Sequence, residues 1–178
     1  ALARGHVEQA VALYASRVAL LQEQDALAEA AAAQVDLAMA LVRQNRLEQA
    51  LAWTASSLDV ARMLNDTELE GRALQAAALA LFHAGRATRA LQTMQQAGAA
   101  FRRAGLKKQL LQASVIAAAM GSQSEPPKQA AKRSLEALAL ARELGATDTE
   151  AALLTLNGNL VLLAGADPAR ALDFYERA

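Results

Sequence analysis

Apolar residues recur at every third or fourth position along most of the chain, and short groups of turn residues interrupt them at regular intervals. This spacing places the apolar side chains on one face of a helix, and no stretch shows the strict alternation of a half-buried strand. The prolines, Pro126, Pro127 and Pro168, all lie outside the apolar-periodic stretches, so no helix has to be broken to accommodate them. The pattern predicts an all-α protein.

The turn segments repeat along the chain. When the sequence is aligned with itself at a shift of 40 residues, a turn and the start of the following helix match, the last time after one inserted residue. A spacing of this size is typical of repeat proteins built from helix pairs, so each unit is predicted to run helix, turn, helix, turn. The matching segments are GHVEQAV (5–11), NRLEQAL (45–51), GRATRAL (85–91), EPPKQAA (125–131) and GADPARAL (165–172).

Three columns of the alignment hold small or turn-forming residues. Two small columns on successive helices predict that the helix backbones approach closely there, because larger side chains would hold them apart. The third column marks a turn, since Gly and Asn tolerate the left-handed conformation that ends a helix. The columns are Ala10, Ala50, Ala90, Ala130 and the displaced Ala171; Ala38, Ala78, Ala118 and Gly158; and Asp25, Asn65, Gly105 and Gly145.

Start and stop signals set the helix boundaries. Thr67 with Glu70, and Thr147 with Glu150, have the spacing of a capping box, and Asp167 before Pro168 fits a cap and a first helical position. Because Glu125 stands in place of the turn Gly, Gly121 is expected to end its helix early and leave a loop at 121–126. The second helices are predicted at about 6–24, 47–64, 87–104, 127–144 and 168–178, and the first helices at about 27–43, 67–83, 107–121 and 148–164.

These features resemble the tetratricopeptide repeat in its 40-residue form, as found in Pins-type polarity scaffolds and in the sensor arms of bacterial signal-transduction ATPases. The resemblance covers essentially the whole chain and rests on the small columns, the turn Gly and the stretch LALARELGATDTEAALLTLNGNL (138–160). The chain departs from the family where an aromatic is usual, because that column holds Tyr14, Thr54, Met94, Ser134 and Tyr175.

The resemblance implies an α-solenoid of stacked antiparallel helix pairs, a right-handed superhelix whose first helices line a concave groove for a partner helix or peptide. Residues 1–178 are expected to form one repeat domain, a piece of a longer chain. The Lys/Asn clamp of family members that hold a chaperone's carboxylate is not present. The groove residues implied are Val35, Met39, Val42, Arg43, Arg72, Gln75, Leu79, Phe82, His83, Gln112, Val115, Ala119, Thr155, Asn159 and Leu162.

Composition excludes several function classes. The apolar content of 54% argues for a folded chain, and the longest run without charged or turn residues falls far short of a membrane span, so we expect a soluble protein. There is no cysteine, with which a reducing compartment is compatible, and we expect a cytoplasmic location. No phosphate loop, nucleophile elbow or metal-ligand cluster occurs, and His83 fits the end of a helix better than a ligand set. We therefore expect no cofactor, no metal and no enzymatic activity.

Charge is distributed unevenly although the net charge is zero. Residues 71–133 carry ten Lys or Arg and a single acid, Glu125. Either the charge of solvated helix faces has simply drifted, or a central basic surface attracts an acidic partner segment. Arg72 is expected to have few local carboxylates to pair with, so it is either solvated or a candidate contact for such a partner. Few aromatics and zero net charge argue against nucleic acid.

Two hypotheses for function follow. The first is a protein-interaction module, a scaffold or sensor arm that holds a partner helix or an acidic segment in its groove. The second is a structural or regulatory spacer within a larger multidomain protein such as a bacterial signalling regulator. At the N-terminal end, residues 6–24 lack a first helix of their own, so we expect either preceding repeats or self-association there. The apolar residues left with one covered side would be Val7, Val11, Tyr14, Val18 and Leu21.

Overall fold

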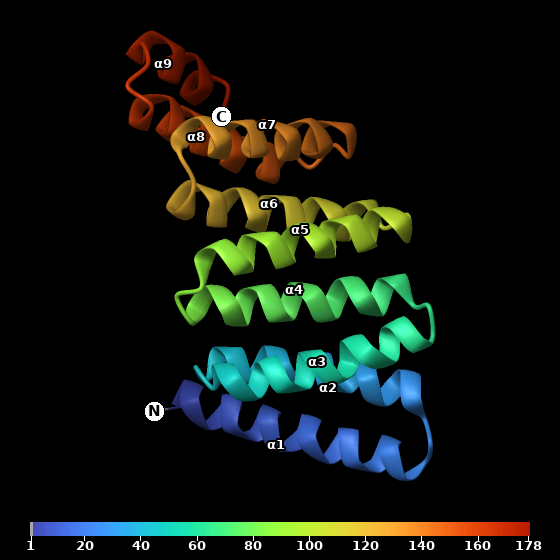
Figure 1. The fold of residues 1–178 in the computed structure, drawn as a ribbon. Helices are drawn as coiled ribbons and strands as arrows, with labels where there is room; N and C mark the ends of the chain where they lie inside the picture. Colours follow the sequence, from blue (N-terminus) through green and yellow to red (C-terminus); the bar gives the residue numbers. More distant parts are fainter. Residues whose placement is uncertain (1) are drawn as a thin grey trace. The chain divides into compact units, whose positions relative to one another are not determined.

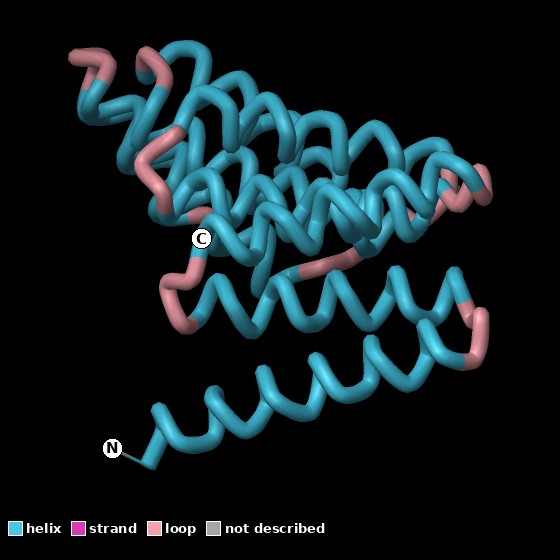
Figure 2. The backbone as a smooth tube through the Cα atoms, turned by 60° about the horizontal axis from the view of Figure 1, so that its bottom comes forward, coloured by secondary structure: helices cyan, strands magenta, loops and turns pink. Residues whose placement is uncertain are grey.

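The computed structural model describes residues 2–178, with side chains from residue 8 onward (Figure 1). All regular structure in this range is helical, which confirms the predicted all-α class. Short turns connect the helices (Figure 2). The helices are α1 (Leu2–Glu23), α2 (Leu27–Arg43), α3 (Leu47–Met63), α4 (Thr67–His83), α5 (Ala87–Arg103), α6 (Lys107–Ser124), α7 (Pro127–Glu143), α8 (Thr147–Leu163) and α9 (Pro168–Glu176).

The chain divides into two compact units, Ala1–Gly105 and Leu106–Ala178, here called unit 1 and unit 2. Within unit 1, each helix from α1 to α5 packs against the next, and the first helices α2 and α4 also contact one another. Within unit 2, α6, α7, α8 and α9 pack in the same consecutive order. Stacking of consecutive helices is the arrangement expected for an α-solenoid, in which no helix pair buries its apolar face alone.

Left-handed residues end most helices where the sequence predicts them. Asp25 and Asn65 have φ values of 54°, and Gly105 and Gly145 have φ values of 71° and 62°. At the end of α2, Asn45 donates to the carbonyl of Val42 and the next amide donates to that of Leu41, both at 2.9 Å. This pair of bonds is the Schellman motif, which satisfies carbonyls that the helix leaves unpaired. The turns are therefore short and closely similar.

The connection between α6 and α7 differs from the predicted loop at 121–126. Helix α6 continues through Gly121 to Ser124, and only Glu125 and Pro126 separate it from α7. Glu125 is extended, with φ −120° and ψ 158°, as a residue before proline prefers to be. Gly121 stays helical because its missing side chain makes room: an added Cβ would lie 2.8 Å from Glu125 Oε2.

The helix starts confirm one predicted cap and correct two. Asp167 Oδ1 accepts a hydrogen bond from the Ala169 amide at 3.0 Å, as predicted for the start of α9. At α4 the cap is Asp66, which accepts from the Leu69 amide at 2.9 Å, and Thr67 is already helical. At α8 the N-cap is Ala146, which makes no side-chain bond. Both predicted capping boxes are therefore wrong.

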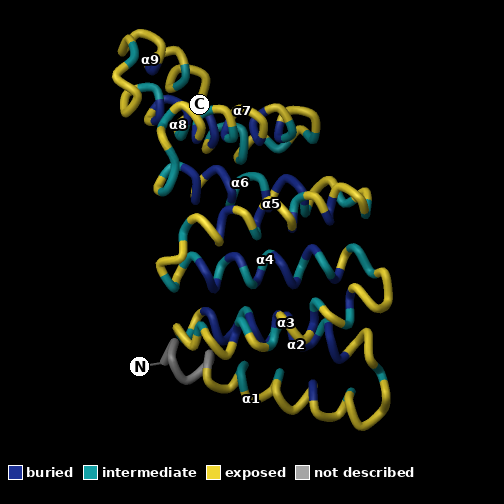
Figure 3. The backbone as a smooth tube through the Cα atoms, in the orientation of Figure 1, coloured by how far each residue is buried: buried dark blue, intermediate teal, exposed yellow. Residues whose placement is uncertain are grey.

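Close helix approach in the core depends on small residues, as the columns predict. Ala38, Ala78 and Ala118 are fully buried, and the ideal Cβ of Gly158 would lie 2.5 Å from Tyr175 Cε1. Gly71, which the sequence columns do not mark, is equally tight, because an added Cβ would lie 2.6 Å from Phe101 Cε1. Burial is continuous along α4 (Figure 3).

Gly71→Ala is expected to destabilise the fold more than Gly158→Ala does. The Phe101 ring is fully buried and cannot move away, whereas Tyr175 is 36% exposed and can turn outward. Overpacking costs ~1–3 kcal/mol, and the better helix propensity of Ala offsets up to ~1 kcal/mol at both sites. Urea unfolding of the two variants measures the difference.

The same experiment includes Phe101→Leu, alone and combined with Gly71→Ala. Because the smaller side chain relieves the contact, Phe101→Leu should cost less in the Gly71→Ala background than in the wild type. Additive costs in this cycle would contradict the proposed contact between the two residues.

Candidate functional site

Helices α2 and α4 bring most of the predicted groove residues of unit 1 onto one face. On α4 the spacing of Arg72, Gln75, Leu79 and Phe82 places these side chains along a single stripe, and α2 contacts α4 directly. Their side chains are partly accessible to solvent, and those at the helix ends are exposed. We call this surface the first-helix face. It comprises Asp36, Met39 and Arg43 of α2 and Arg72, Gln75, Leu79, Phe82 and His83 of α4.

Two predicted groove residues lie in the core of unit 1 instead. Val35 packs in a buried cluster with Ala61 and Leu69, and Val42 packs in a second cluster with Val18 and Leu41. Their exposed fractions are below one tenth, so neither side chain is available to a partner. Both positions contact the second helices, which sequence spacing alone does not distinguish from the open side.

Arg72 has a carboxylate partner, although few local carboxylates were expected and its side chain was predicted to be solvated or open to a ligand. Its Nη2 donates to Asp36 Oδ1 of α2 at 3.1 Å, and Arg17 Nη1 of α1 lies 3.8 Å from Asp36 Oδ2. The three side chains come from three helices and are all partly exposed. The repeat could have predicted this pair. Position 72 corresponds to position 32 one repeat earlier, and Asp36 lies one helical turn after position 32 on a parallel helix.

The predicted groove residues of unit 2 lie on α6 and α8. Gln112 and Ala119 are exposed on α6, while Val115 packs partly against the core of the unit. On α8, Thr155 donates to its own helix, and Asn159 accepts a hydrogen bond from the Tyr175 hydroxyl at 2.7 Å. Leu162 is exposed. These side chains reach the surface, and Asn159 is already bonded to α9.

Neighbouring helices neutralise much of the basic stretch. Arg86 pairs with Glu48 at 2.8 Å, Arg103 pairs with Glu70, and Lys107 pairs with Glu143 at 2.7 Å. The hydrogen bond to Glu143, and next the charge of Glu143, raise the pKa of Lys107 above its ordinary value. The basic residues of this stretch that make no ion pair within the described part of the chain are Arg89, Arg102, Lys108, Lys128 and Lys132.

Unit 1 has a basic edge, a feature that the order of residues in the sequence hides. The turns at 44–46 and 84–86 lie on the edge drawn at the left in Figure 1, and those at 24–26 and 64–66 lie on the opposite edge. At the first edge Glu48 pairs with Arg86, and the basic side chains there are Arg43, Arg46, Arg86 and Arg89. The second edge carries both signs, because Arg62, Arg102 and Arg103 lie there with Glu23, Asp25, Glu29, Asp66, Glu68 and Glu70, and Glu70 pairs with Arg62 and Arg103.

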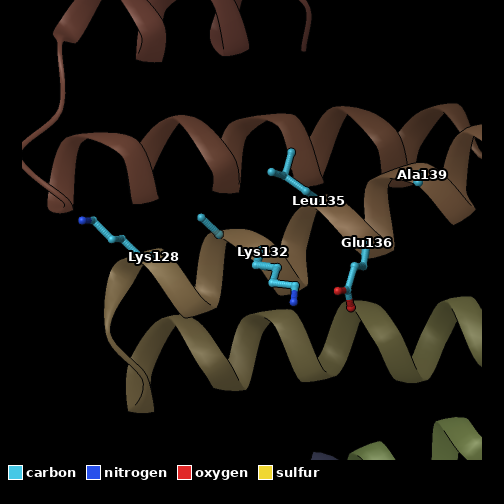
Figure 4. Close-up of a pocket in the computed structure, with 6 residues that line it drawn as sticks. Lys128, Lys132, Leu135, Glu136 and Ala139 are labelled. Carbon is cyan, nitrogen blue, oxygen red and sulfur yellow. The ribbon is translucent and has the colours of Figure 1, made fainter.

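A second surface lies on the outer side of α7. Lys128, Lys132, Leu135, Glu136 and Ala139 line an open hollow of about 560 Å³ there (Figure 4). Leu135 is 45% exposed, and Lys128 and Lys132 point in different directions from the helix (Figure 4). Every lining residue comes from one helix, so the hollow is a shallow helix surface and not an enclosed ligand site.

Chemistry-bearing clusters are scarce in the part of the chain that the structure describes. No group of three or more His, Asp or Glu side chains in residues 8–178 is arranged to hold a metal ion. None of the helices in the described range is long and apolar enough to cross a membrane.

Comparison with known proteins identifies the fold. No protein-family model and no curated protein sequence matches the chain. BtubC (BKLC) from P. vanneervenii is similar in structure, with a TM-score of 0.80 and 18% identity, over 96% of this chain and 71% of that chain. A Podosopora anserina putative kinesin light chain with nearly identical TPR-like repeats matches with a TM-score of 0.79 and 15% identity, over 98% and 86%.

The chain has the fold of tetratricopeptide-like repeat proteins, as the sequence resemblance implies. This α-solenoid class is typical of protein-protein interaction scaffolds, which are generally not enzymes, because stacked repeats expose long surfaces rather than enclosed pockets.

Removing the acid from a sheltered ion pair should cost more stability than removing it from an exposed pair. Glu125 accepts two hydrogen bonds from Arg133, at 2.8 and 3.1 Å, and the side chains are only 16% and 20% exposed. We expect Glu125→Gln to cost about 2 kcal/mol and Glu48→Gln less than about 1 kcal/mol. Urea unfolding of both variants measures the costs, and equal values would show that shelter from water does not strengthen the Glu125 pair.

Proposed function

We propose that this protein is an interaction module that binds a partner helix or an extended acidic segment on the first-helix face of unit 1. The observation that carries the proposal is the composition of this face. Leu79, Phe82 and Met39 offer apolar contact area that is only partly covered, and Arg72 and Gln75 lie in the same stripe. Apolar anchors beside a few polar groups are what an amphipathic segment needs for affinity and orientation.

The charge of the face supports an acidic partner. Arg43 and His83 end α2 and α4 at the basic edge, and neither makes an ion pair among the described residues. A partner carboxylate near this edge would be attracted during approach, and added salt would weaken that attraction. We propose a cytoplasmic location, with which the absence of cysteine is compatible. We likewise propose that the protein needs no metal and no cofactor.

The second candidate function is a structural or regulatory spacer in a larger multidomain protein, such as a bacterial signalling regulator. The fold supports it equally, because stacked repeats also act as extended connectors. The two functions differ in one outcome. An interaction module binds its partner as the isolated repeat domain, whereas a spacer has no affinity of its own.

The interaction hypothesis predicts that the isolated domain binds a labelled synthetic amphipathic helix carrying Leu and Glu on adjacent faces. Phe82→Ser removes a central apolar contact and should weaken binding about ten-fold or more. Leu163→Ser is the matched control, because Leu163 is an exposed apolar residue of unit 2 outside this face. Fluorescence anisotropy measures both affinities, and circular dichroism verifies the fold.

Three results would count against the interaction hypothesis. If the wild type does not bind the acidic peptide at any concentration tested, the result is the one that the spacer function predicts. Equal weakening by Phe82→Ser and Leu163→Ser would show that the peptide binds elsewhere. Binding that does not change with salt concentration would show that the partner need not be acidic.

We also propose self-association through the outer face of α1. The apolar stripe expected to be bare is in fact covered: Val18 is buried, and Val11, Tyr14 and Leu21 pack against the core beside it. Val7 lies outside the residues with described side chains. The apolar residues left open on α1 are instead Leu13 and Leu20, which are 72% and 57% exposed.

The outer face of α1 is complementary in size to a second copy of itself. Gln9, Leu13, Ser16, Leu20 and Glu23 follow the alternating spacing of four and three residues that two helices use to pack side by side. In an antiparallel pair centred on Ser16, each leucine faces an exposed alanine of the other copy. Leu13 meets Ala19, and Leu20 meets Ala12.

Leu13→Glu is therefore expected to keep the protein monomeric at concentrations where the wild type forms dimers. A charge in the centre of the contact would have to be buried without a partner. Leu163→Glu, at an equally exposed leucine of α8, should leave the dimer intact. Sedimentation velocity over a range of concentrations distinguishes the species. A wild type that is monomeric throughout contradicts the self-association.

A further inference from the structure

We propose that Arg17 and Arg72 form a binding site for a carboxylate of the partner, and that Asp36 occupies this site in the free protein. The inference rests on the proposed function, because it assigns one contact of the first-helix face. It differs from the sequence-based expectation, in which Arg72 alone is a candidate contact for the partner.

The two arginines converge on one acid from opposite sides. Arg72 Nη2 of α4 donates to Asp36 Oδ1 at 3.1 Å, and Arg17 Nη1 of α1 lies 3.8 Å from Asp36 Oδ2. Helix α2, which carries Asp36, contacts both α1 and α4. The guanidinium groups are therefore held near each other by three packed helices and not by a flexible loop.

The site retains unused positive charge and unused donors. Two guanidinium groups and one carboxylate leave a net charge of one, and each guanidinium has about five N–H donors. The contacts with Asp36 involve one nitrogen of each arginine. A second carboxylate is the natural ligand for what remains, because its geometry is the one that the two arginines already bind in Asp36.

Solvent reaches all three side chains. The exposed fractions of Arg17, Asp36 and Arg72 are 56%, 34% and 38%, so an incoming carboxylate meets them without any helix separating. Ion pairs at this exposure are weak, since water screens them. Asp36 is therefore a competitor that a partner's acid can displace or join, and it lowers the affinity for weakly acidic segments.

Neighbouring side chains limit which partners fit. Gln75, Leu79 and Phe82 continue the stripe from Arg72 towards the end of α4, over about 15 Å of helix. A partner whose carboxylate reaches Arg17 and Arg72 has its apolar side chains opposite Leu79 and Phe82 only if they lie about two and three helical turns away. The site therefore selects an acidic residue with an apolar pair at that distance, and not merely net negative charge.

The test compares Asp36→Asn with Glu150→Gln in the isolated domain. Each change removes one partly exposed carboxylate from an arginine, but Glu150 pairs with Arg142 in unit 2 and belongs neither to this face nor to the basic edge. The probe is the labelled Leu/Glu amphipathic peptide, and its copy with Gln at every Glu is the neutral control. We expect Asp36→Asn to tighten binding of the acidic peptide about five-fold and Glu150→Gln to leave it unchanged.

Arg72→Gln completes the set. It should weaken binding of the acidic peptide and abolish the gain from Asp36→Asn when the two changes are combined. The neutral peptide should bind all variants alike. Thermal unfolding followed by circular dichroism verifies each fold, and the Nε–Hε resonances of Arg17 and Arg72, followed by NMR during the titration, report the contact directly.

The outcomes separate this inference from the proposed function. If the acidic peptide binds the wild type but Asp36→Asn and Arg72→Gln do not alter its affinity, the face binds partners and the carboxylate site is refuted. An equal gain from Asp36→Asn and Glu150→Gln would reflect net charge alone and also refute it. If the peptide binds neither the wild type nor any variant, the proposed function fails together with the site.

Discussion

The close approach of neighbouring helices is the constraint on which the rest of this structure depends. Where two backbones come together, the space between them is fixed, and the side chains must share it. Gly71 lies beneath Phe101, and Gly158 lies beneath Tyr175, so in both pairs the missing side chain on one helix makes room for an aromatic ring of the other. Because cores are packed at near-crystalline density, enlarging either glycine forces its neighbour to move.

Short, repeated turns determine where each helix of the stack begins. Residues such as Asn45 and Gly145 adopt the left-handed conformation that ends a helix within two residues, so each helix starts almost where the last one finishes. In unit 1, the turns bring α2 and α4 into contact, so the apolar and polar side chains of the first-helix face lie next to one another. The α6–α7 connection reaches the same end differently. There an extended Glu125 and two prolines replace the glycine, and the Glu125–Arg133 pair fills the space that Gly121 leaves.

The charge that each helix shows at the surface depends on ion pairs with neighbouring helices. The stretch from Arg72 to Arg133 is basic in sequence, yet Asp36, Glu48, Glu70 and Glu143 from other helices pair with several of its residues. In the interaction that we propose, a partner meets what remains: the basic edge of unit 1 and the Asp36 carboxylate that Arg17 and Arg72 share. A surface of this kind favours recognition by position, because each charge is already balanced in part and only a correctly placed acid gains from it.

The sequence by itself determined the helix class, almost every helix boundary and the small-residue contacts at Ala38, Ala78, Ala118 and Gly158. Periodicity, glycine and proline carry these features, and each acts within a few residues of itself. Only the tertiary structure decided that Val35 and Val42 are buried, that Arg72 meets Asp36, and that Gly71 lies against Phe101. The last two contacts join residues 36 and 30 positions apart. All of these facts depend on how the side chains of one helix fit between those of the next, which local sequence pattern does not encode.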